Sequence, residues 1–418
     1  MKVNGTRQKV HSLIDKVYQK RNLEMAWESV KENRGSGGID KVTIAKFDAE
    51  SEAELQRLHE ELKQGTYRPM PVKRTYIPKK GKPNEKRPLG IPAIRDRVCQ
   101  QALRNRLEPI FEPLFSESSF GYRPGRSTHQ AMRKIYRELM AGYEWIVDAD
   151  LRDFFGTVQH EPLIDMIAEQ VSDGRILRLV RQMLEAGYME SGKRYETPSG
   201  TPQGGVISPL FSNIYLNSFD HEMTKRGYRL TRFADDWVVL CKTQAEAATA
   251  IRDARAILET LGLTLHPDKT RITHIKWGFE FLGYKLKQGK GLALPKGKVK
   301  KAAKGNIYAY PKDKSIKAFK DSIRARTRRR IPLSLYELID SINPVIRGWG
   351  NYFRKAHVRK LFNRLQRWII RRIWSHRFKH WRNAGWKKLP ESVLYSKYKL
   401  VNLVSLIPDL NPRSAPNG

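Results

Sequence analysis

Cysteine, long apolar runs and acidic residues are all in short supply in this 418-residue chain, and each shortage excludes a class of protein. The two cysteines, Cys99 and Cys241, are too few for a disulfide framework or a cysteine-type zinc module. Both lie in segments with an apolar pattern. We therefore expect two reduced thiols in the core.

The scarcity of long apolar runs argues against a membrane protein. No run approaches the roughly 20 apolar residues that a spanning helix needs. The N-terminal segment MKVNGTRQKVHSLIDK has no apolar core of the kind found in signal peptides. We expect a soluble, cytoplasmic protein with no membrane partner.

The shortage of acids leaves a large positive charge. The chain has 79 lysines and arginines against 43 acidic residues, a formal net charge of +36. Because 40% of the residues are hydrophobic, a folded core is still expected. A foldable chain with this excess of positive charge predicts a polyanionic partner, of which nucleic acid is the most common.

The positive charge is concentrated in the last third of the chain. From Gly291 to Gly418 there are 31 lysines and arginines and 6 acidic residues, a net charge of +25. A lysine- and glycine-rich segment, Lys287 to Asn306, marks the change. The sequence therefore predicts a nearly balanced front part and a strongly basic back part.

Residue patterns in the front part favour an α+β fold with a small antiparallel sheet. A strand over 72–79, a charged turn over 80–86 and a second strand over 87–92 resemble a hairpin. Helices are predicted over 23–35, 51–65 and 95–111.

The back part is predicted to be mainly helical. Between Val358 and Ile373 apolar residues recur at helical spacing. A separate basic row with spacings of four, three and four consists of Lys360, Arg364, Arg367 and Arg371. The row is either a solvated helix face or, given the charge of this region, a surface that contacts nucleic acid.

Two groups of acids stand out against the basic background. Asp235 and Asp236 lie between two strand-like segments in RLTRFADDWVVLC. Upstream, Asp148 and Asp150 alternate with Val147, Ala149 and Leu151, which puts the two acids on one face of a strand.

Adjacent acids at a turn are often only caps or solvated residues. Clustered carboxylates, however, are costly unless a cation meets them. A strand-end aspartate beside a hairpin-tip aspartate suits Mg²⁺, which prefers carboxylates and substrate phosphates. Two such ions, with Mn²⁺ as an alternative, serve in-line phosphoryl transfer.

Four segments in this order resemble the palm motifs of reverse transcriptases: DADLRDFF, GTPQGGVISPLFSNIYL, RFADDWVVL and FEFLGYKL. Three further segments narrow the resemblance to the bacterial group II intron reverse transcriptase/maturases: RPLGIPAIRDRVCQQAL, SSFGYRPGRSTHQAM and INPVIRGWGNYFRKAH. The resemblance spans roughly Asn22 to Trp381.

The resemblance implies a right-hand polymerase that adds dNTPs to a DNA primer on an RNA template. Its parts would be an N-terminal extension and the start of the fingers (1–70), fingers (71–140), palm (141–290), a helical thumb/maturase domain (291–385) and a tail (386–418). It also implies binding to a group II intron RNA, promotion of splicing and retromobility, and association with the nucleoid or a ribonucleoprotein. It does not indicate protein partners.

Roles for individual residues follow from the same resemblance. Asp150, Asp235 and Asp236 would be the metal ligands and catalytic acids. Asp148 would be a fourth ligand or, as we prefer, a local structural residue.

The nucleotide-binding residues implied are Lys79, Arg87, Phe155, Gln203 and Lys269. Phe155 would collide with a ribose 2′-hydroxyl, Gln203 would bond the nucleotide or the template backbone, and Lys79 and Arg87 would grip the triphosphate. Lys269 would protonate pyrophosphate.

In the back part, a primer grip is implied for Phe281, Leu282, Gly283 and Tyr284. RNA contact is implied for Arg347 and Arg354, with the surrounding aromatics in the core. The basic row from Lys360 to Arg371 would extend this surface.

The chain departs from the family pattern in two ways. Phe233 stands where a tyrosine is usual before the paired acids, and the His- and Cys-rich metal sites of a homing endonuclease are absent. Target cleavage by this chain is therefore not expected.

Three alternatives compete with this interpretation. Phe155 argues against an RNA-dependent RNA polymerase, and the complete acid set argues against a mainly RNA-binding maturase. A domesticated reverse transcriptase used in defence or DNA repair would keep the same residues, so the sequence leaves that alternative open.

Overall fold

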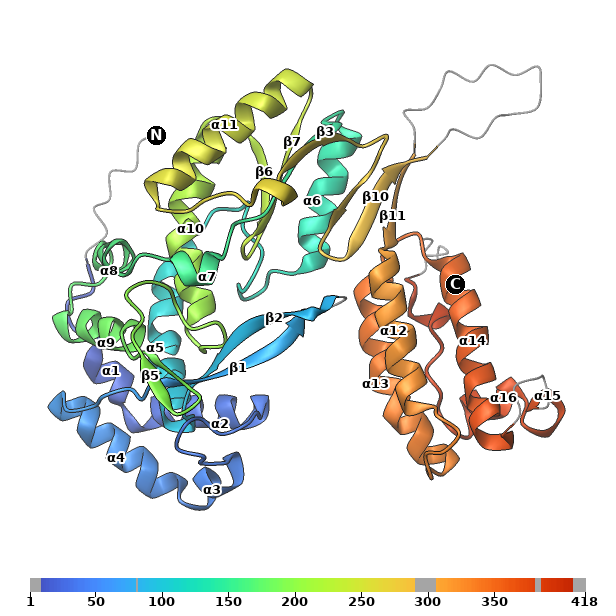
Figure 1. The fold of residues 1–418 in the computed structure, drawn as a ribbon, viewed down its shortest axis with the longest axis horizontal. Coiled ribbons are helices and arrows are strands. Elements are labelled where there is room, and N and C mark those ends of the chain that lie inside the picture. The colour runs from blue at the N-terminus through green and yellow to red at the C-terminus, as the bar shows by residue number, and fades with distance from the viewer. Residues whose placement is uncertain (1–8, 80–81, 290–305, 380–384, 409–418) are drawn as a thin grey trace, which may run out of the picture. The chain divides into compact units, whose positions relative to one another are not determined.

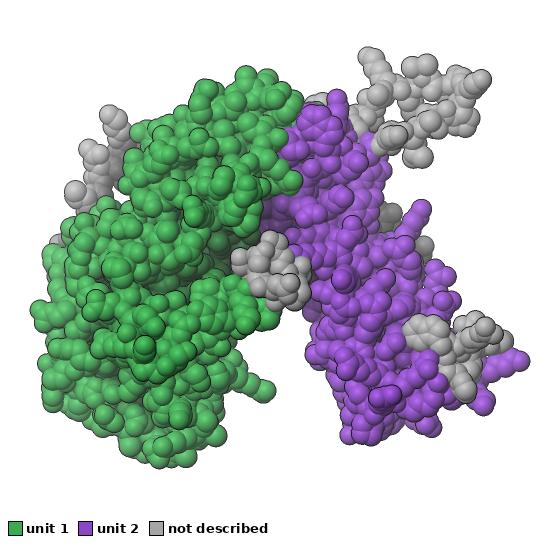
Figure 2. Space-filling model, in the orientation of Figure 1, with its two compact units in different colours: residues 1–272 green, residues 273–418 purple. Residues whose placement is uncertain are grey.

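The computed structural model describes residues 9–79, 82–289, 306–379 and 385–408, and it divides into two compact units at Ile272/Thr273 (Figures 1 and 2). We call residues 1–272 unit 1 and residues 273–418 unit 2. In unit 2, β9 and β10 form a sheet with β11. The expected limits of the N-terminal extension, fingers, palm, thumb/maturase domain and tail stay predictions.

Unit 1 opens with a helical layer. Its helices are α1 (Ile14–Tyr18), α2 (Lys20–Asn33), α3 (Ile44–Ala49), α4 (Ser51–Gln64) and α5 (Ile94–Phe111). The predicted helices over 23–35, 51–65 and 95–111 are confirmed within a few residues. Gly65 ends α4 in the left-handed conformation, φ +77°, as a C-terminal glycine typically does.

A four-stranded sheet follows, in the order β2-β1-β4-β5. Its strands are β1 (Val72–Lys79), β2 (Lys82–Ile91), β4 (Tyr188–Glu190) and β5 (Lys193–Tyr195). The hairpin of β1 and β2 is confirmed, but residues 82–86, predicted as a turn, belong to β2. The pairing of β1 with β4 is parallel, so this sheet is not purely antiparallel.

A second sheet, ordered β6-β7-β3-β8, carries the acidic segments. Its strands are β3 (Trp145–Ala149), β6 (Arg229–Phe233), β7 (Asp236–Cys241) and β8 (Arg271–His274). The helices of this region are α6 (Thr128–Met140), α7 (Phe154–Thr157), α8 (His160–Ala168), α9 (Gly174–Leu184), α10 (Ser208–Lys225) and α11 (Gln244–Thr260). Helix α11 packs on β3 and β7, and α6 packs on β6 (Figure 1).

Unit 2 combines a small sheet with a helical bundle. The sheet is ordered β11-β10-β9, from β9 (Phe279–Phe281), β10 (Tyr284–Gln288) and β11 (Ile307–Pro311). The helices are α12 (Asp313–Arg326), α13 (Leu335–Phe353), α14 (Arg359–Phe378), α15 (Gly385–Lys388) and α16 (Glu391–Ser396). The α+β class is confirmed, although the described residues form three sheets where one was expected.

Both cysteines are free and buried, as predicted. Burial raises the pKa of the Cys241 thiol to about 12, which keeps it protonated. Among the described residues, no helix combines the length and the apolar character that a membrane crossing requires.

Candidate active site

Strand β3 presents its acids as the alternating pattern predicts. Val147 and Ala149 are buried, whereas Asp148 and Asp150 are partly exposed. Asp150 directly follows the strand, and its backbone oxygen accepts a hydrogen bond of 2.8 Å from the His266 backbone N–H. The end of β3 is therefore fixed beside the segment that leads into β8.

The hairpin of β6 and β7 carries the other acids at its tip. Phe233 pairs with Asp236, so Ala234 and Asp235 form a two-residue turn. Ala234 has φ +59°, a left-handed conformation that an alanine rarely adopts and that hairpin turns of this length require. Local strain of this kind is often found at functional sites.

The structure brings Asp150 and Asp235 within electrostatic reach. Burial is the main cause that raises the pKa of the Asp235 carboxyl, and the negative charge of Asp150 raises it further. Arg232 and Lys269 oppose this rise. Two acids that are far apart in the chain therefore interact electrostatically in the fold.

Basic side chains from the segment before β8 and from its first residue neutralise the acids of β3. The Lys269 ammonium forms an ion pair with the Asp150 carboxylate. Arg271 donates from Nη2 to Asp148 Oδ2 at 2.9 Å and from Nε at 3.1 Å. Asp148 thus has a local cationic partner, which supports a structural role for it.

Tyr122 links the acids to the hairpin of β1 and β2. Burial raises the pKa of Tyr122, Asp235 and Asp236 raise it further, and Arg87 opposes them. Arg87 and both hairpin acids therefore all shift the pKa of the Tyr122 hydroxyl. Sequence reasoning did not single out this tyrosine, although its segment belongs to the family pattern.

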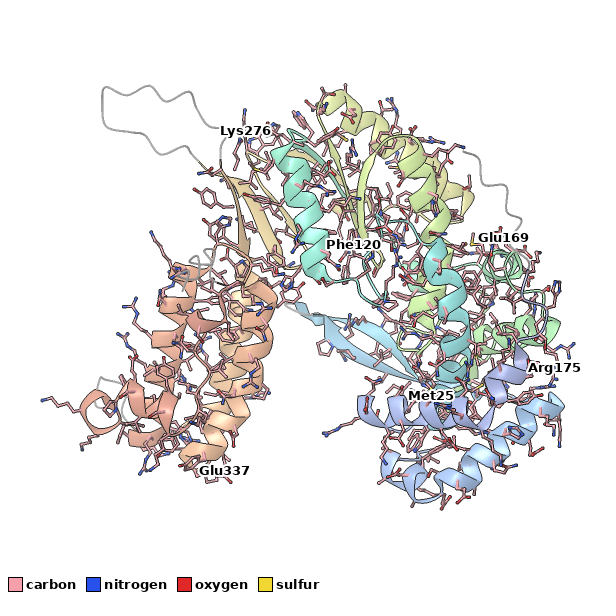
Figure 3. The ribbon with its side chains drawn as sticks, turned by 180° about the vertical axis from the view of Figure 1, so that it is seen from behind. Met25, Phe120, Glu169, Arg175, Lys276 and Glu337 are labelled. Carbon is pink, nitrogen blue, oxygen red and sulfur yellow. The ribbon has the colours of Figure 1, made fainter. Side chains whose placement is uncertain are left out.

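Gly121 explains how Tyr122 comes so close to the acidic turn. A Cβ atom added at Gly121 would lie 2.3 Å from the backbone nitrogen of Ala234. Only glycine lets the two backbones approach to this distance. Figure 3 labels Phe120, the preceding residue, whose backbone N–H donates to Arg232 O at 2.9 Å.

Phe155 and Gln203 line one open pocket with an empty volume of about 850 Å³, together with residues of β1 and β2. The neighbouring Phe154 is buried, 2% exposed, whereas Phe155 is only partly buried. The two adjacent rings are thus separated into a core residue and a pocket residue. The predicted contact of Phe155 with the sugar of a nucleotide requires that its side chain be exposed at the pocket.

The loop that carries Gln203 is packed against β2. The Gly90 backbone N–H donates to Gln203 O at 2.8 Å. A Cβ atom at Gly204 would lie 2.6 Å from Gly90 O, so this glycine serves an approach between two protein backbones.

Of the two residues predicted to bind the triphosphate, the structure describes the side chain of Arg87 but not that of Lys79. Arg87 lies on β2 and is exposed. The backbone of Lys79 lies at the end of β1, but its side chain is outside the described residues.

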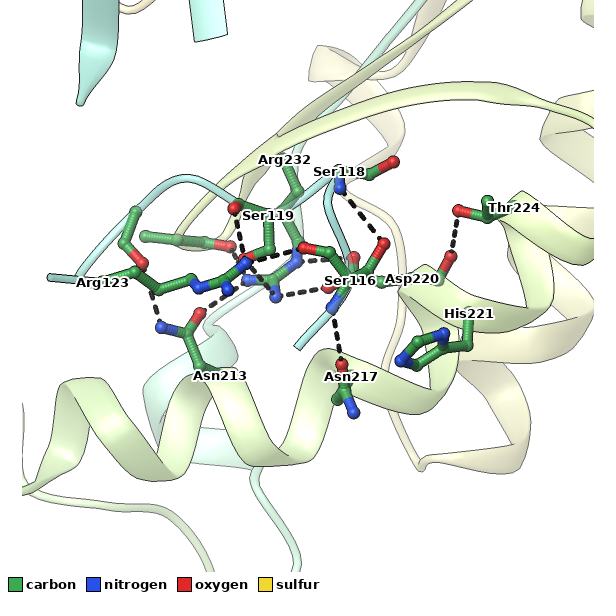
Figure 4. Close-up of polar contacts among 12 residues, drawn as sticks. Ser116, Ser118, Ser119, Arg123, Asn213, Asn217, Asp220, His221, Thr224 and Arg232 are labelled. Carbon is green, nitrogen blue, oxygen red and sulfur yellow. Dashed lines mark hydrogen bonds and ion pairs between the residues drawn. The ribbon is translucent and has the colours of Figure 1, made fainter. Parts of the chain in front are cut away.

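A fully buried ion pair stabilises the acidic hairpin of β6 and β7 (Figure 4). The Arg232 guanidinium donates to both carboxylate oxygens of Asp220, at 2.7 and 2.5 Å, and both side chains are 0% exposed. Its other N–H groups reach Ala234 O at 2.8 Å, Asn213 Oδ1 at 3.1 Å and Ser119 Oγ at 2.9 Å. All five donors of the guanidinium are used, and one of them holds the turn itself.

Sequence reasoning missed this network, although a signal was present. Arg232 lies three residues before Asp235, in a strand where Leu230 and Thr231 are also buried. A buried arginine needs a buried partner, and Asp220 on α10 provides it.

The predicted primer-grip residues form the hairpin of β9 and β10 in unit 2. Leu282 and Gly283 make the turn, with φ values of +47° and +79°. Phe281 and Tyr284 are buried, and Tyr352 Oη donates to Leu282 O at 2.8 Å. Of the four predicted residues, Leu282 and Gly283 are thus the partly exposed ones, while Tyr284 packs on Tyr352 and Phe353 of α13.

The predicted RNA-contact residues of unit 2 are largely at the surface. Arg347 on α13 is exposed, and Arg354 is partly buried. The expected basic row on α14 is exposed along its whole length: Lys360, Arg364, Arg367 and Arg371. Of the motif's aromatics, which were expected in the core, Phe353 is buried, whereas Trp349 and Tyr352 are only partly buried. The Trp349 ring stacks on Phe319 with centroids 4.5 Å apart.

Among the described residues, no three histidine, cysteine or acidic side chains are grouped closely enough to hold a metal ion by themselves. Asp150 and Asp235 interact, and Asp236 is exposed beside them on β7. The protein alone therefore supplies a pair of carboxylates near a third, rather than a closed metal cage.

Comparison with known proteins identifies two family domains in this chain. Residues 77–286 match the reverse transcriptase (RNA-dependent DNA polymerase) family, and residues 316–392 match the group II intron maturase-specific domain. The first match contains the acids, Phe155 and Gln203. The second contains α13, α14 and the basic row.

Individual relatives agree with both matches. Protein YkfC of Escherichia coli is 36% identical over 288 residues, which cover 60% of this chain and 75% of the relative. The group II intron-encoded protein LtrA of Lactococcus lactis is 30% identical over 414 residues, which cover 79% of this chain and 68% of LtrA. Nuclear intron maturase 4 of Arabidopsis thaliana is 33% identical over 143 residues, which cover 34% of this chain and 18% of that protein. This chain thus belongs to the group II intron-encoded reverse transcriptases, which are RNA-directed DNA polymerases with a maturase domain that acts in intron splicing.

Proposed function

We propose that this chain extends a DNA primer with dNTPs on an RNA template, with Asp150, Asp235 and Asp236 as ligands of two divalent metal ions. We also propose that it binds the group II intron RNA that encodes it, promotes its splicing and retromobility, and resides in the bacterial cytoplasm with that RNA. The observation that carries the polymerase proposal is the electrostatic coupling of Asp150 and Asp235 across two neighbouring strands.

Reverse transcriptases use divalent metal ions, and the donor set suits Mg²⁺ or Mn²⁺. Carboxylate oxygens are the ligands that Mg²⁺ prefers, and it takes its remaining ligands from water and substrate phosphates. An open pair of carboxylates is therefore a better match than a closed cage. When bound, the two ions would activate the primer 3′-hydroxyl and stabilise the leaving pyrophosphate.

The chain's own residues would bind and select the nucleotide. Phe155 would exclude a ribose 2′-hydroxyl by contact, and Gln203 would bond the nucleotide or template backbone without adding charge. Lys79 and Arg87 would hold the triphosphate.

Lys269 would have two successive roles. Paired with Asp150, it balances the acid before substrate arrives. Released from Asp150, its ammonium would donate a proton to pyrophosphate.

The direct test is primer extension by the purified protein with Mg²⁺, dNTPs, an RNA template and a DNA primer. Asp235→Asn keeps the shape of the side chain but removes a metal ligand, so the extension rate should fall about a thousandfold or more, equivalent to several kcal/mol. Asp165→Asn, at an exposed acid on α8, is the matched control and should extend normally. If Asp235→Asn extends the primer as fast as the wild type, the proposed metal site is wrong.

A further inference from the structure

The small sheet of unit 2 has one face that no function above explains. Alternation along β10 buries Tyr284 and Leu286 and exposes Lys285 and Lys287. In the antiparallel register, Lys285 lies opposite Tyr310 and Lys287 lies opposite Tyr308. Since opposite residues project to the same side, these two lysines and two tyrosines share the outer face.

The two tyrosine rings are nearly parallel and are held in place. Their centroids are 6.0 Å apart with an interplanar angle of 16°, and Tyr310 is 42% exposed. The ring of His357 packs edge-on against Tyr308, with centroids 4.9 Å apart. His357 is itself fixed, because its Nδ1 accepts from the Ala309 N–H at 3.1 Å.

The lysines of this face are available for an anionic ligand. Both are exposed, and neither forms an ion pair within the part of the chain that the structure describes. The acid on the same face, Glu280, is 3.8 Å from Lys312, which offsets its charge. The outer face is therefore positive, with the lysines on its central strand β10 and the aromatic rings on its edge strand β11.

This combination matches single-stranded nucleic acid. Bases stack on aromatic rings regardless of sequence, and lysines follow the phosphates. A duplex conceals the faces of its bases, whereas loops and bulges of folded RNA present them. Charge complementarity and ring exposure together thus favour unpaired nucleotides over a double helix.

We propose that the face formed by Lys285, Lys287, Tyr308 and Tyr310 binds unpaired nucleotides of RNA. The choice of RNA over single-stranded DNA rests on the proposed function, in which intron RNA is the natural partner. The bases would stack on Tyr310 and Tyr308, and the two lysines would hold the adjoining phosphates.

The location of the site is tested by photo-crosslinking the full chain to a single-stranded RNA oligonucleotide containing 4-thiouridine. Mass spectrometry should place a crosslink on Tyr308 or Tyr310. A fully paired RNA of the same sequence should give much less of it. Crosslinks that avoid both tyrosines, or that form equally with the duplex, would overturn the proposal.

Affinity measurements with the same oligonucleotide separate stacking from charge. Tyr310→Ala should weaken binding about fivefold or more, the loss of one stacked base, and Tyr310→Phe should retain the wild-type affinity. Tyr336→Ala removes another exposed tyrosine of unit 2 and should have no effect. Lys285→Gln with Lys287→Gln should reduce the slope of log K against log salt by about 1.4, or 0.7 for each lysine.

Two further measurements separate this site from the polymerase proposal and RNA from DNA. A DNA oligonucleotide that binds through Tyr310 as tightly as the RNA would overturn the assignment to RNA. Primer extension by the wild type is measured in parallel. Normal extension with no effect of Tyr310→Ala on RNA binding refutes only this site, whereas crosslinking at the tyrosines without extension refutes only the polymerase proposal.

Discussion

At the scale of single residues, burial and contact partners distinguish chemically identical neighbours. Phe154 and Phe155 are adjacent rings, 5.2 Å apart between centroids, yet one is core and the other faces a pocket. Asp148 and Asp150 are on the same strand face, yet one is paired with Arg271 and the other with Lys269. A role assigned from residue type alone would not separate either pair.

Phe155→Val should relax the choice of sugar. A smaller side chain removes the contact that excludes the 2′-hydroxyl, so the preference for dNTPs over rNTPs should fall about 10-fold to 100-fold. The measurement is kcat/KM for each nucleotide in single-nucleotide primer extension. Incorporation of dNTPs serves as the internal control, and unchanged sugar discrimination would contradict the proposed role.

At the scale of elements, the hairpin of β6 and β7 depends on segments that are distant in sequence. Arg232 joins the turn at Ala234 to Asp220 and Asn213 on α10. The Arg232 backbone N–H donates to Ser118 O at 2.8 Å, which attaches the strand to the segment before α6. The position of the acids is thus set by a polar cluster with no solvent contact.

Arg232→Met should therefore destabilise the protein strongly. It leaves Asp220 as a buried charge with no guanidinium partner, so the free energy of unfolding should fall by about 3–5 kcal/mol. Chemical denaturation measures this change. Arg226→Met, at partly exposed ion pairs with Glu222 of α10 and Asp253 of α11, should cost far less.

A second variant shows whether the loss of stability in Arg232→Met arises from the unpaired charge of Asp220. Arg232→Met combined with Asp220→Leu removes both charges and should be more stable than Arg232→Met alone. Equal stability of wild type and Arg232→Met would show that the ion pair does not support the hairpin.

The sequence predicted those parts of the site that follow from local patterns. Alternation around Asp150, the two strands around Asp235 and the helical spacing after Val358 are properties of short segments. The network of Arg232 and the approach of Gly121 to Ala234 are pairings across the chain. A periodic pattern within one segment does not specify partners elsewhere in the chain. These contacts could therefore be identified only from the folded structure.

Secondary structure shows the same limit. The segment 82–86 is charged and contains Lys82, Pro83 and Asn84, which favour a turn. Pairing with β1 draws it into a strand instead. The pairing of β1 with β4 joins segments more than a hundred residues apart, and propensity alone could not indicate it.

At the scale of the whole molecule, charge is divided along the chain. Of the net +36, +25 lies from Gly291 onward. Within this region the basic row of α14 is exposed, while Phe362, Leu365 and Ile369 on the same helix are buried. The helix is thus anchored by one face and carries a row of positive charge on the other.

Neutralising this row should reduce the salt dependence of RNA binding. Changing four residues to glutamine, namely Lys360, Arg364, Arg367 and Arg371, should lower the slope of log K against log salt by about 2.8 if all four contact phosphates. Fluorescence anisotropy with an intron-like RNA across a salt series provides the measurement.

A control with the same charge change distinguishes contact from general attraction. Four exposed lysines of unit 1 are suitable: Lys46, Lys63, Lys193 and Lys225. Changing them to glutamine should leave the slope closer to the wild-type value. Equal slopes for the two quadruple variants would show that the row on α14 is not a specific RNA contact.

The ion pairs of Asp148 and Asp150 join residues that the ribosome synthesises at different times. Lys269 follows Asp150 by 119 residues, and Arg271 follows Asp148 by 123. On the ribosome the acidic strand therefore emerges long before the basic residues that balance it. A nascent chain interrupted between these two points carries uncompensated carboxylates, and the catalytic centre reaches its final electrostatic state only after β8 has been synthesised.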